Sequence, residues 1–169
     1  VSRMKIISNT LEIFTDKLPE NFLWIGFIKL ILPNSKIIHC LRNSKDNCFS
    51  LFKNHFPAGR INYCYNLNET VQYYNLYSDI MKHWNKLFPD FVYNLKYENL
   101  LTNTEIEVKS LLKFCSLRWD KECLNFHQNP KIIKTASDVQ ARSKIYLSSM
   151  GSWKKYESHL TDCFKNLKY

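Results

Sequence analysis

The sequence contains few glycines and no glycine-rich loop. Three glycines occur among 169 residues: Gly26 lies in an apolar segment, Gly59 in a mid-chain loop and Gly151 near the end. A loop whose backbone amides cradle phosphate needs closely spaced glycines, usually with Ser or Thr, directly after a strand. No stretch of the sequence has this composition, so these residues do not include such a loop.

The six cysteines lack the spacing of a metal site. They form no C-x-x-C pair and have no nearby histidine at zinc-ligand spacing, so we expect no metal. Cys40, in KIIHCL, and Cys115, in LLKFC, occupy apolar positions and are expected to be reduced, buried thiols. Free thiols favour a reducing compartment, and a cytoplasmic location is expected.

Long apolar runs and a leader segment are also absent. The longest mostly apolar stretch, residues 22–32, is too short to cross a membrane and contains Lys29. The first residues do not show the charged and then apolar pattern of a signal peptide. We therefore expect a soluble chain with no membrane partner.

Positive charge is in excess, with 24 Lys and Arg against 15 Asp and Glu. This excess suits an anionic ligand or surface. A nucleic-acid binder would show a clustered basic stripe or a known motif. Neither is present, so we expect no nucleic-acid partner. Because 45% of the residues are hydrophobic, the chain can form one domain with its own core.

Strand and helix patterns alternate along the chain. The predicted elements, in order, are an extended or strand segment to Thr15, a helix from Pro19 to just before Pro33, a strand in KIIHCL, a helix beginning at Ser44 or Asp46, a long helix over 68–88, a strand in FVYNLKY, a helix from Asn103 or Thr104, and a last helix over 156–167. The β-branched KIIHCL run is typical of a parallel strand buried on both faces. The order predicts an α/β fold with a short parallel sheet flanked by helices.

Arg42 is the first candidate for ligand binding. It follows the KIIHCL strand and precedes a helix, where open α/β sheets place their ligand crevice. An anion there would meet backbone N–H groups, a helix dipole and a guanidinium. Ser50 follows about two helical turns later and can present a hydroxyl to the same anion. By position alone, a structural salt bridge of Arg42 is the competing interpretation.

Several segments, in order, resemble the sulfotransferase superfamily. They are TDKLPENFLWIGFIKLILPNSKIIHCLRNSKDNCFSLF, YYNLYSDIMKHW, LKYENLL, LLKFCSLRWDKECLNFH and TASDVQARSKIYLSSMGSWKKY. The likeness runs from Thr15 to Tyr156 and is greatest to bacterial members often fused to tetratricopeptide repeats, with tyrosylprotein sulfotransferases as cousins. It implies an incomplete three-layer, P-loop-like α/β fold. The implied activity is transfer of a sulfuryl group from 3'-phosphoadenosine-5'-phosphosulfate, the co-substrate, to a hydroxyl or amine acceptor.

The resemblance also implies roles for single residues. Arg42 and Ser50 match the pair that holds the donor's 3'-phosphate, and Tyr97 matches a tyrosine that contacts the nucleotide. Ser137 is similar to a serine near the bridging sulfate oxygen. Lys17 falls where tyrosylprotein members have a catalytic lysine, which suits stabilisation of charge on the transferring group. Without the resemblance, Lys17 is a solvated loop side chain and Tyr97 an aromatic packed at a strand end.

The segment GSWKKY resembles the G-x-W-K core of the family's C-terminal nucleotide-binding signature. Ser149 and Gly151 are the cofactor-binding residues that it implies, and Trp153 is expected in the core. Cytosolic members place an Arg-Lys-Gly triplet just before this core, whereas residues 146–148 are Tyr, Leu and Ser. We expect Arg142 to supply the cation that is lost.

Two family features have no counterpart in the sequence: the loop that grips the 5'-phosphosulfate and the acidic general base, which lies upstream of the matched region. His39, His55 and His83 are candidates for a base, but none is nominated. His39 is expected to be buried in a strand, and His83 to lie on the packed face of the long helix.

Two interpretations of the whole chain remain open. In the first, residues 1–169 are the C-terminal portion of one sulfotransferase domain, inactive alone, whose first strand and loop lie upstream together with a possible tetratricopeptide-repeat region. In the second, the chain is a non-catalytic nucleotide-binding or protein-interaction module of the same fold. The class of the sulfate acceptor is left open by the sequence.

Overall fold

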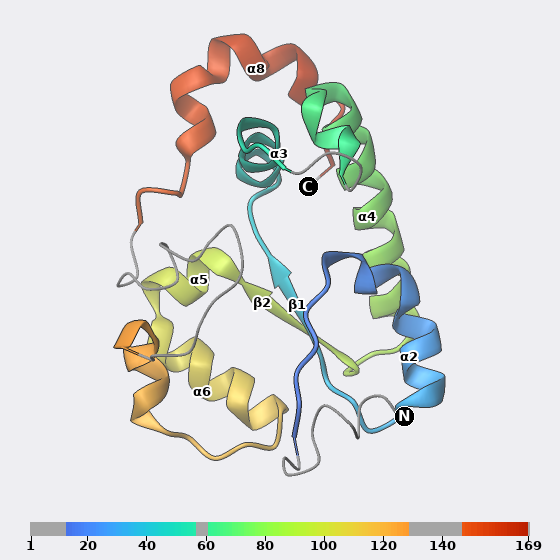
Figure 1. The fold of residues 1–169 in the computed structure, drawn as a ribbon, viewed down its shortest axis with the longest axis vertical. Coiled ribbons are helices and arrows are strands. Elements are labelled where there is room, and N and C mark those ends of the chain that lie inside the picture. Colours follow the sequence, from blue (N-terminus) through green and yellow to red (C-terminus); the bar gives the residue numbers. More distant parts are fainter. Residues whose placement is uncertain (1–12, 57–60, 129–146, 169) are drawn as a thin grey trace.

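A two-stranded parallel sheet lies at the centre of the computed structural model (Figure 1). The structure describes residues 13–56, 61–128 and 147–168. The strands β1 (Ile37–Leu41) and β2 (Val92–Lys96) pair in register from Ile37 opposite Val92 to Leu41 opposite Lys96. Each strand begins with two residues that favour extended backbone, Ile37 and Ile38 in β1 and Val92 and Tyr93 in β2.

Helices make up most of the remaining described structure. Those that follow the α-helical pattern are α2 (Ile25–Ile31), α3 (Ser44–Lys53), α4 (Leu67–Leu87), α5 (Tyr97–Thr102), α6 (Thr104–Phe114) and α8 (Glu157–Phe164). The 3-10 helices are η1 (Pro19–Trp24), η2 (Asn62–Tyr65), η3 (Lys121–Gln128) and η4 (Ser152–Tyr156). The predicted strands in KIIHCL and FVYNLKY and the predicted long helix are therefore confirmed.

The sheet has helices on both faces. On one face, Ile25 of α2, Met81 of α4 and Val92 of β2 belong to one buried cluster. On the other face, α6 contacts β2, and the rings of Tyr93 and Phe114 lie 5.1 Å apart. Figure 1 shows α4 and α2 on one side of the strands and α5 and α6 on the other. The predicted α/β layered fold with a short parallel sheet is confirmed.

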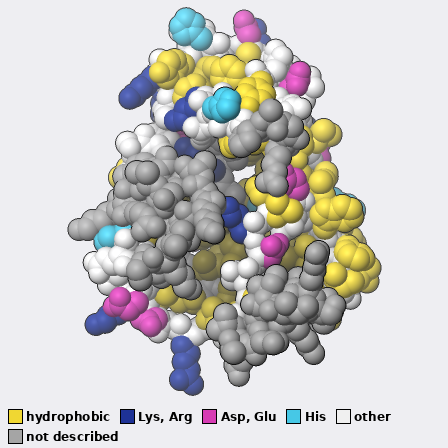
Figure 2. Space-filling model, in the orientation of Figure 1, with side chains coloured by type: hydrophobic (Ala, Val, Ile, Leu, Met, Phe, Trp, Pro, Cys, Tyr) yellow, Lys and Arg dark blue, Asp and Glu magenta, His cyan; other side chains and the backbone are white. Residues whose placement is uncertain are grey.

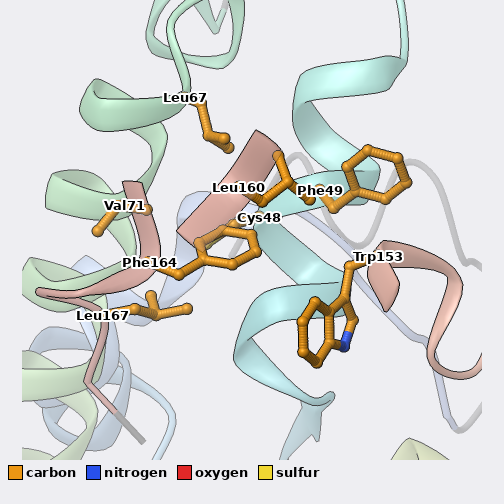
Figure 3. Packing of buried hydrophobic residues seen from close by; sticks show 8 residues of the cluster. All are labelled: Cys48, Phe49, Leu67, Val71, Trp153, Leu160, Phe164 and Leu167. Atoms are coloured by element: carbon orange, nitrogen blue, oxygen red, sulfur yellow. The ribbon is translucent and has the colours of Figure 1, made fainter. Parts of the chain in front are cut away.

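A second buried cluster lies beyond the carboxyl end of β1. It joins α3 to α4, α8 and η4, and consists of Cys48, Phe49, Leu67, Val71, Trp153, Leu160, Phe164 and Leu167. Figure 3 shows side chains from α8 meeting those of α3. Trp153 is buried, as expected, and its ring meets the ring of Phe164 edge-on. This cluster anchors the end of the chain beside the first turn of α3.

Several expectations about burial are wrong. The strand β1 is not buried on both faces, because α6 lies over β2 and leaves Ile38 43% exposed. Cys40, two residues along the same face, is also exposed. His83 is exposed on α4, not packed. The predicted helix start at Ser44 is confirmed, and Asn43 directly before it caps α3: its side chain accepts from the backbone N–H of Asp46, which has no partner within the helix.

The segment before η1 is extended but does not pair in a sheet. Residues 13–18 have no regular secondary structure. Within the described residues the sheet therefore has two strands, and the third predicted strand remains an extended segment. No helix in the described parts of the chain is both long and apolar enough to cross a membrane.

Candidate functional site

Arg42 lies where β1 ends and α3 is about to begin. Its Nη2 donates to the backbone oxygen of Ser149 over 2.7 Å, and its guanidinium carbon lies 5.3 Å from the centre of the Tyr97 ring. Its Nε is buried and has no hydrogen-bond partner among the described residues. The structural salt bridge considered from the sequence is not seen among these residues, since the contacts of Arg42 are to a carbonyl and a ring.

Tyr97 and Ser149 complete this cluster. Tyr97 is the first residue of α5, directly after β2, so it lies at the same edge of the sheet as Arg42. Its hydroxyl is 3.1 Å from the hydroxyl of Ser149. The structure thus brings together three residues, Arg42, Tyr97 and Ser149, that the family resemblance assigns to donor binding.

Gly151 follows Ser149 by two residues and is held by Asp46. Its backbone N–H donates to Oδ2 of Asp46 over 2.7 Å, and its φ of +68° is in the left-handed region that glycine adopts without strain. Ser152 Oγ and the backbone N–H of Trp153 approach Oδ1 of the same carboxylate at 3.3 Å and 3.5 Å. The loop before η4 is therefore tied to the first turn of α3.

The first turn of α3 provides further polar groups beside Arg42. The backbone N–H of Asn43 donates to Oε1 of Glu98 over 2.8 Å. Ser44 is 5% exposed, and its Oγ is buried with no partner in the described parts of the chain. A helix N-terminus with an adjacent guanidinium and an unsatisfied hydroxyl suits an anion. The unpartnered Arg42 Nε and Ser44 Oγ are therefore two hydrogen-bond donors that an anion at this end of α3 can use.

Not every predicted site residue joins this cluster. The contact described for Ser50 is local: its carbonyl accepts from Asn54 Nδ2, and its hydroxyl has no described hydrogen bond to Arg42. Ser137 and Arg142 lie outside the described residues. The convergence of Ser50 and Arg142 with Arg42 on the 3'-phosphate, and the place of Ser137 near the bridging sulfate oxygen, therefore stay predictions.

Lys17 lies in a different place, at a pocket of about 460 Å³. The pocket lies between the extended segment 13–18, β1, α3 and α4, and its walls include the rings of Phe22, Tyr63 and Tyr73. Lys17 is exposed. Arg42 is not part of the pocket wall, so the described structure gives no contact between the predicted catalytic lysine and the anion cluster.

His39 lies in the wall of the same pocket and has both ring nitrogens engaged. Nδ1 is 2.8 Å from Asn94 Oδ1 on β2, and Nε2 hydrogen-bonds to the hydroxyl of Tyr77 on α4. Burial lowers the pKa of His39, against an opposing effect of the Asn94 hydrogen bond. Burial also raises the pKa of Tyr77. A neutral His39 with both nitrogens occupied is poorly placed to take a proton from a substrate.

Sequence reasoning missed Asp46 and Ser44 as site residues. Asp46 was expected only as part of a helix start, and its contacts to residues 151–153 span more than 100 positions, which no local pattern reveals. The sequence feature that could have identified them is their position in RNSKD, within about one helical turn after the arginine at the end of a strand. In the described residues no three His, Cys, Asp or Glu side chains gather as metal ligands would.

Comparison with known proteins supports one family. A model described as "Sulfotransferase family" matches residues 2–121, more than half of the chain. An uncharacterized protein of Aquifex aeolicus (strain VF5) is 38% identical over 155 residues, covering 90% of this chain and 20% of that relative. The chain thus spans about a fifth of the length of the curated relative that it matches. The chain therefore belongs to the sulfotransferase family, which confirms the resemblance found in its sequence.

Proposed function

We propose that this chain is the part of a sulfotransferase that binds the 3'-phosphate of the donor 3'-phosphoadenosine-5'-phosphosulfate. The donor supplies the sulfuryl group, and the residues of this chain bind and orient it. The observation that carries the proposal is the partly buried Arg42 at the carboxyl end of β1, whose buried Nε has no partner among the described residues. That position faces the N-terminus of α3, where an anion is favoured.

Neighbouring contacts support the same proposal. The carbonyl of Ser149 accepts a hydrogen bond from Nη2 of Arg42. This bond holds the guanidinium in place and leaves Nε available. The Tyr97 ring lies against the guanidinium, an arrangement that contributes roughly 0.5–1 kcal/mol at an exposed site and more when water is excluded. We further propose, from the family likeness, that Ser50, Ser137 and Arg142 contact the same nucleotide.

Lys17 is the proposed catalytic residue. Its ammonium would stabilise negative charge that increases on the transferring group and on the leaving phosphate, as cationic groups do in phosphoryl transfer. The supporting observation is its position at a pocket with apolar and aromatic walls, which can hold the organic part of an acceptor. The pocket does not identify the acceptor class.

Calorimetric titration tests the donor site. We expect 3'-phosphoadenosine-5'-phosphate to bind more tightly than 5'-AMP, because only the former carries a 3'-phosphate. Arg42→Ala should weaken the former about ten- to a hundredfold, the effect of losing a charge-assisted hydrogen bond of about 1.5–3 kcal/mol. Arg42→Lys should fall between, since an ammonium lacks the planar fork of the guanidinium.

The matched control is Arg118→Ala, which removes the same charge from an exposed position after α6. It should leave both affinities within about twofold, because Arg118 is exposed and salt screens the interactions of exposed charges. Equal affinity of the wild type for the two nucleotides would reject the proposal. So would an Arg42→Ala variant that binds like the wild type.

A second candidate is favoured by one observation, the lack of any glycine-rich loop in the sequence. In that case the chain binds the nucleotide but transfers no sulfate. Binding of 3'-phosphoadenosine-5'-phosphate is expected in both cases. The measurement that distinguishes the two candidates is sulfate transfer by a longer polypeptide of this protein that contains such a loop. Transfer favours the first candidate, and nucleotide binding without transfer favours the second.

A further inference from the structure

The carboxylate of Asp46 is buried between two segments that are far apart in the sequence. Asp46 is 3% exposed and lies in the first turn of α3. Its oxygens accept from the backbone N–H of Gly151 at 2.7 Å and are approached by Ser152 Oγ and the N–H of Trp153. These are groups at the start of η4, which have no partner within that helix. Asp46 therefore caps η4 from another element.

Two different anchors hold the segment 149–153. The Trp153 side chain fixes its end in the hydrophobic cluster shown in Figure 3, and Lys45 Nζ lies 4.2 Å from the centre of its ring. Burial of an indole is not directional, so it holds the segment in place without setting the orientation of the preceding backbone. Hydrogen bonds to a buried carboxylate are directional, and they set the backbone at Gly151.

The backbone that Asp46 orients is connected directly to Arg42. Ser149, two residues before Gly151, accepts from Arg42 Nη2 through its carbonyl and meets the Tyr97 hydroxyl through its own hydroxyl. A rotation of the segment at Gly151 would move the Ser149 carbonyl, and Arg42 would lose the contact that fixes its guanidinium.

We infer that Asp46 is a positioning residue of the donor site: it orients residues 149–151 so that Ser149 holds Arg42 with Nε directed at the 3'-phosphate. This inference rests on the proposed function. Asp46 does not itself touch the nucleotide.

Because Asp46 is negatively charged, a positioning role and simple electrostatic repulsion predict opposite changes in nucleotide affinity when its charge is removed. A carboxylate beside an anion site repels the anion, so losing its charge alone would strengthen nucleotide binding. Losing its positioning effect would weaken binding, because Arg42 would no longer be held. Asp46→Asn removes the charge and half of the acceptor capacity with almost no change of shape. The direction of the change in affinity therefore distinguishes positioning from simple electrostatics.

The experiment is a calorimetric titration of the full chain with 3'-phosphoadenosine-5'-phosphate and with 5'-AMP. Asp46→Asn should weaken binding of 3'-phosphoadenosine-5'-phosphate about tenfold, which is the effect of losing one charge-assisted hydrogen bond between Arg42 and the 3'-phosphate. It should weaken binding of 5'-AMP less than about twofold. The matched control is Asp79→Asn. Asp79 binds Lys168 and likewise ties the chain end to α4, but through an exposed pair with no described contact to the Arg42 cluster. It should leave both affinities unchanged.

The possible outcomes separate the two proposals. If the wild type binds the 3'-phosphate nucleotide through Arg42 and Asp46→Asn binds it equally or more tightly, the inference is overturned and the proposed function stands. If the wild type shows no preference for the 3'-phosphate, both fail. Where Asp46→Asn does not fold, Ser152→Ala removes one donor to the same carboxylate. It should weaken only the 3'-phosphate nucleotide, by about two- to threefold, and no loss would count against the inference.

Discussion

Gly26 lies against the indole of Trp84 with no room for a side chain. A methyl group at this position of α2 would come within 2.8 Å of Cη2 and 2.9 Å of Cζ3 of Trp84. The indole cannot easily move, because its Nε1 donates to the carbonyl of Phe22 over 2.8 Å and its ring stacks on Phe88. Glycine is therefore required here by packing, although it is a poor helix former.

We predict that Gly26→Ala destabilises the chain. Helix propensity alone would favour alanine by about 1 kcal/mol, whereas forcing an extra methyl group into a packed contact costs about 1–3 kcal/mol. The expected net loss is about 1 kcal/mol in the free energy of unfolding, measured by urea denaturation. Leu30→Ala on the exposed face of α2 is the control and should change it by less than about 0.5 kcal/mol. A stabilised Gly26→Ala variant would show that Trp84 moves freely.

At the scale of elements, a polar network joins β1, β2 and α4. His39 on β1 contacts Asn94 on β2 and Tyr77 on α4, and Asn94 Nδ2 donates to Asn85 of α4 over 2.9 Å. Because burial lowers the pKa of His39, the folded chain favours the neutral ring. The unfolded chain binds a proton near the ordinary pKa of 6.5. Between these two pKa values, the unfolded state carries more bound protons.

This difference predicts how stability depends on pH. The contribution of His39 is fully present above about pH 6.5 and is lost as the pH falls through the lowered folded-state pKa. We expect urea denaturation at about pH 5.5 to show a smaller stability than at about pH 7.5, and His39→Gln to reduce that difference. His83→Gln, at an exposed position on α4, is the matched control and should keep it. An unchanged difference in His39→Gln would contradict the assignment.

The elements themselves were largely predictable because their signals are local. Val71, Tyr74 and Met81 recur at helical spacing in α4, and a β-branched run marks β1. The position of Arg42 at the carboxyl end of a parallel strand also followed from local order. The link from Asp46 to Gly151 did not, because hydrogen bonds between residues more than 100 positions apart leave no trace in local spacing. Exposure of Ile38 likewise depends on where α6 lies across the sheet.

At the scale of the whole molecule, the described structure leaves one edge of β1 without a strand partner. β1 pairs with β2 along one edge, and the pocket lined by Lys17 lies along its other edge. Figure 2 shows hydrophobic side chains gathered over α2 and the adjoining part of α4, where Trp24, Phe27 and Leu30 are exposed. Open strand edges and contiguous apolar surface are typical of faces that another segment covers.

This arrangement agrees with the proposal that a further strand and loop complete the domain. The chain corresponds to about a fifth of the length of its Aquifex aeolicus relative, so proteins of this kind can contain much additional polypeptide. A strand placed along β1 would bring a loop at its carboxyl end toward Arg42, because the carboxyl ends of parallel strands meet at one edge of a sheet. The donor's two ends would then be held by different parts of the protein.

The 169-residue chain alone should bind 3'-phosphoadenosine-5'-phosphate yet transfer sulfate at a negligible rate, because its sequence contains no glycine-rich loop of the kind that grips the 5'-phosphosulfate. A longer polypeptide of this protein with a strand and a glycine-rich loop upstream should transfer sulfate. In that polypeptide, Lys17→Ala should lower kcat by about 10²–10³ and change donor affinity less than about threefold, since the lysine acts on charge that develops in the transition state.

Lys17→Arg should rescue that loss only in part, because a guanidinium differs from an ammonium in shape and hydration. Lys53→Ala, on α3 with its Nζ over the Phe49 ring, is the control for loss of a lysine and should leave kcat unchanged. An ordinary turnover rate in the 169-residue chain would overturn the proposal that a further loop is needed, because other residues must then hold the 5'-phosphosulfate. If the longer polypeptide is active and indifferent to Lys17→Ala, Lys17 is a solvated loop side chain and the charge of the transferring group is stabilised elsewhere.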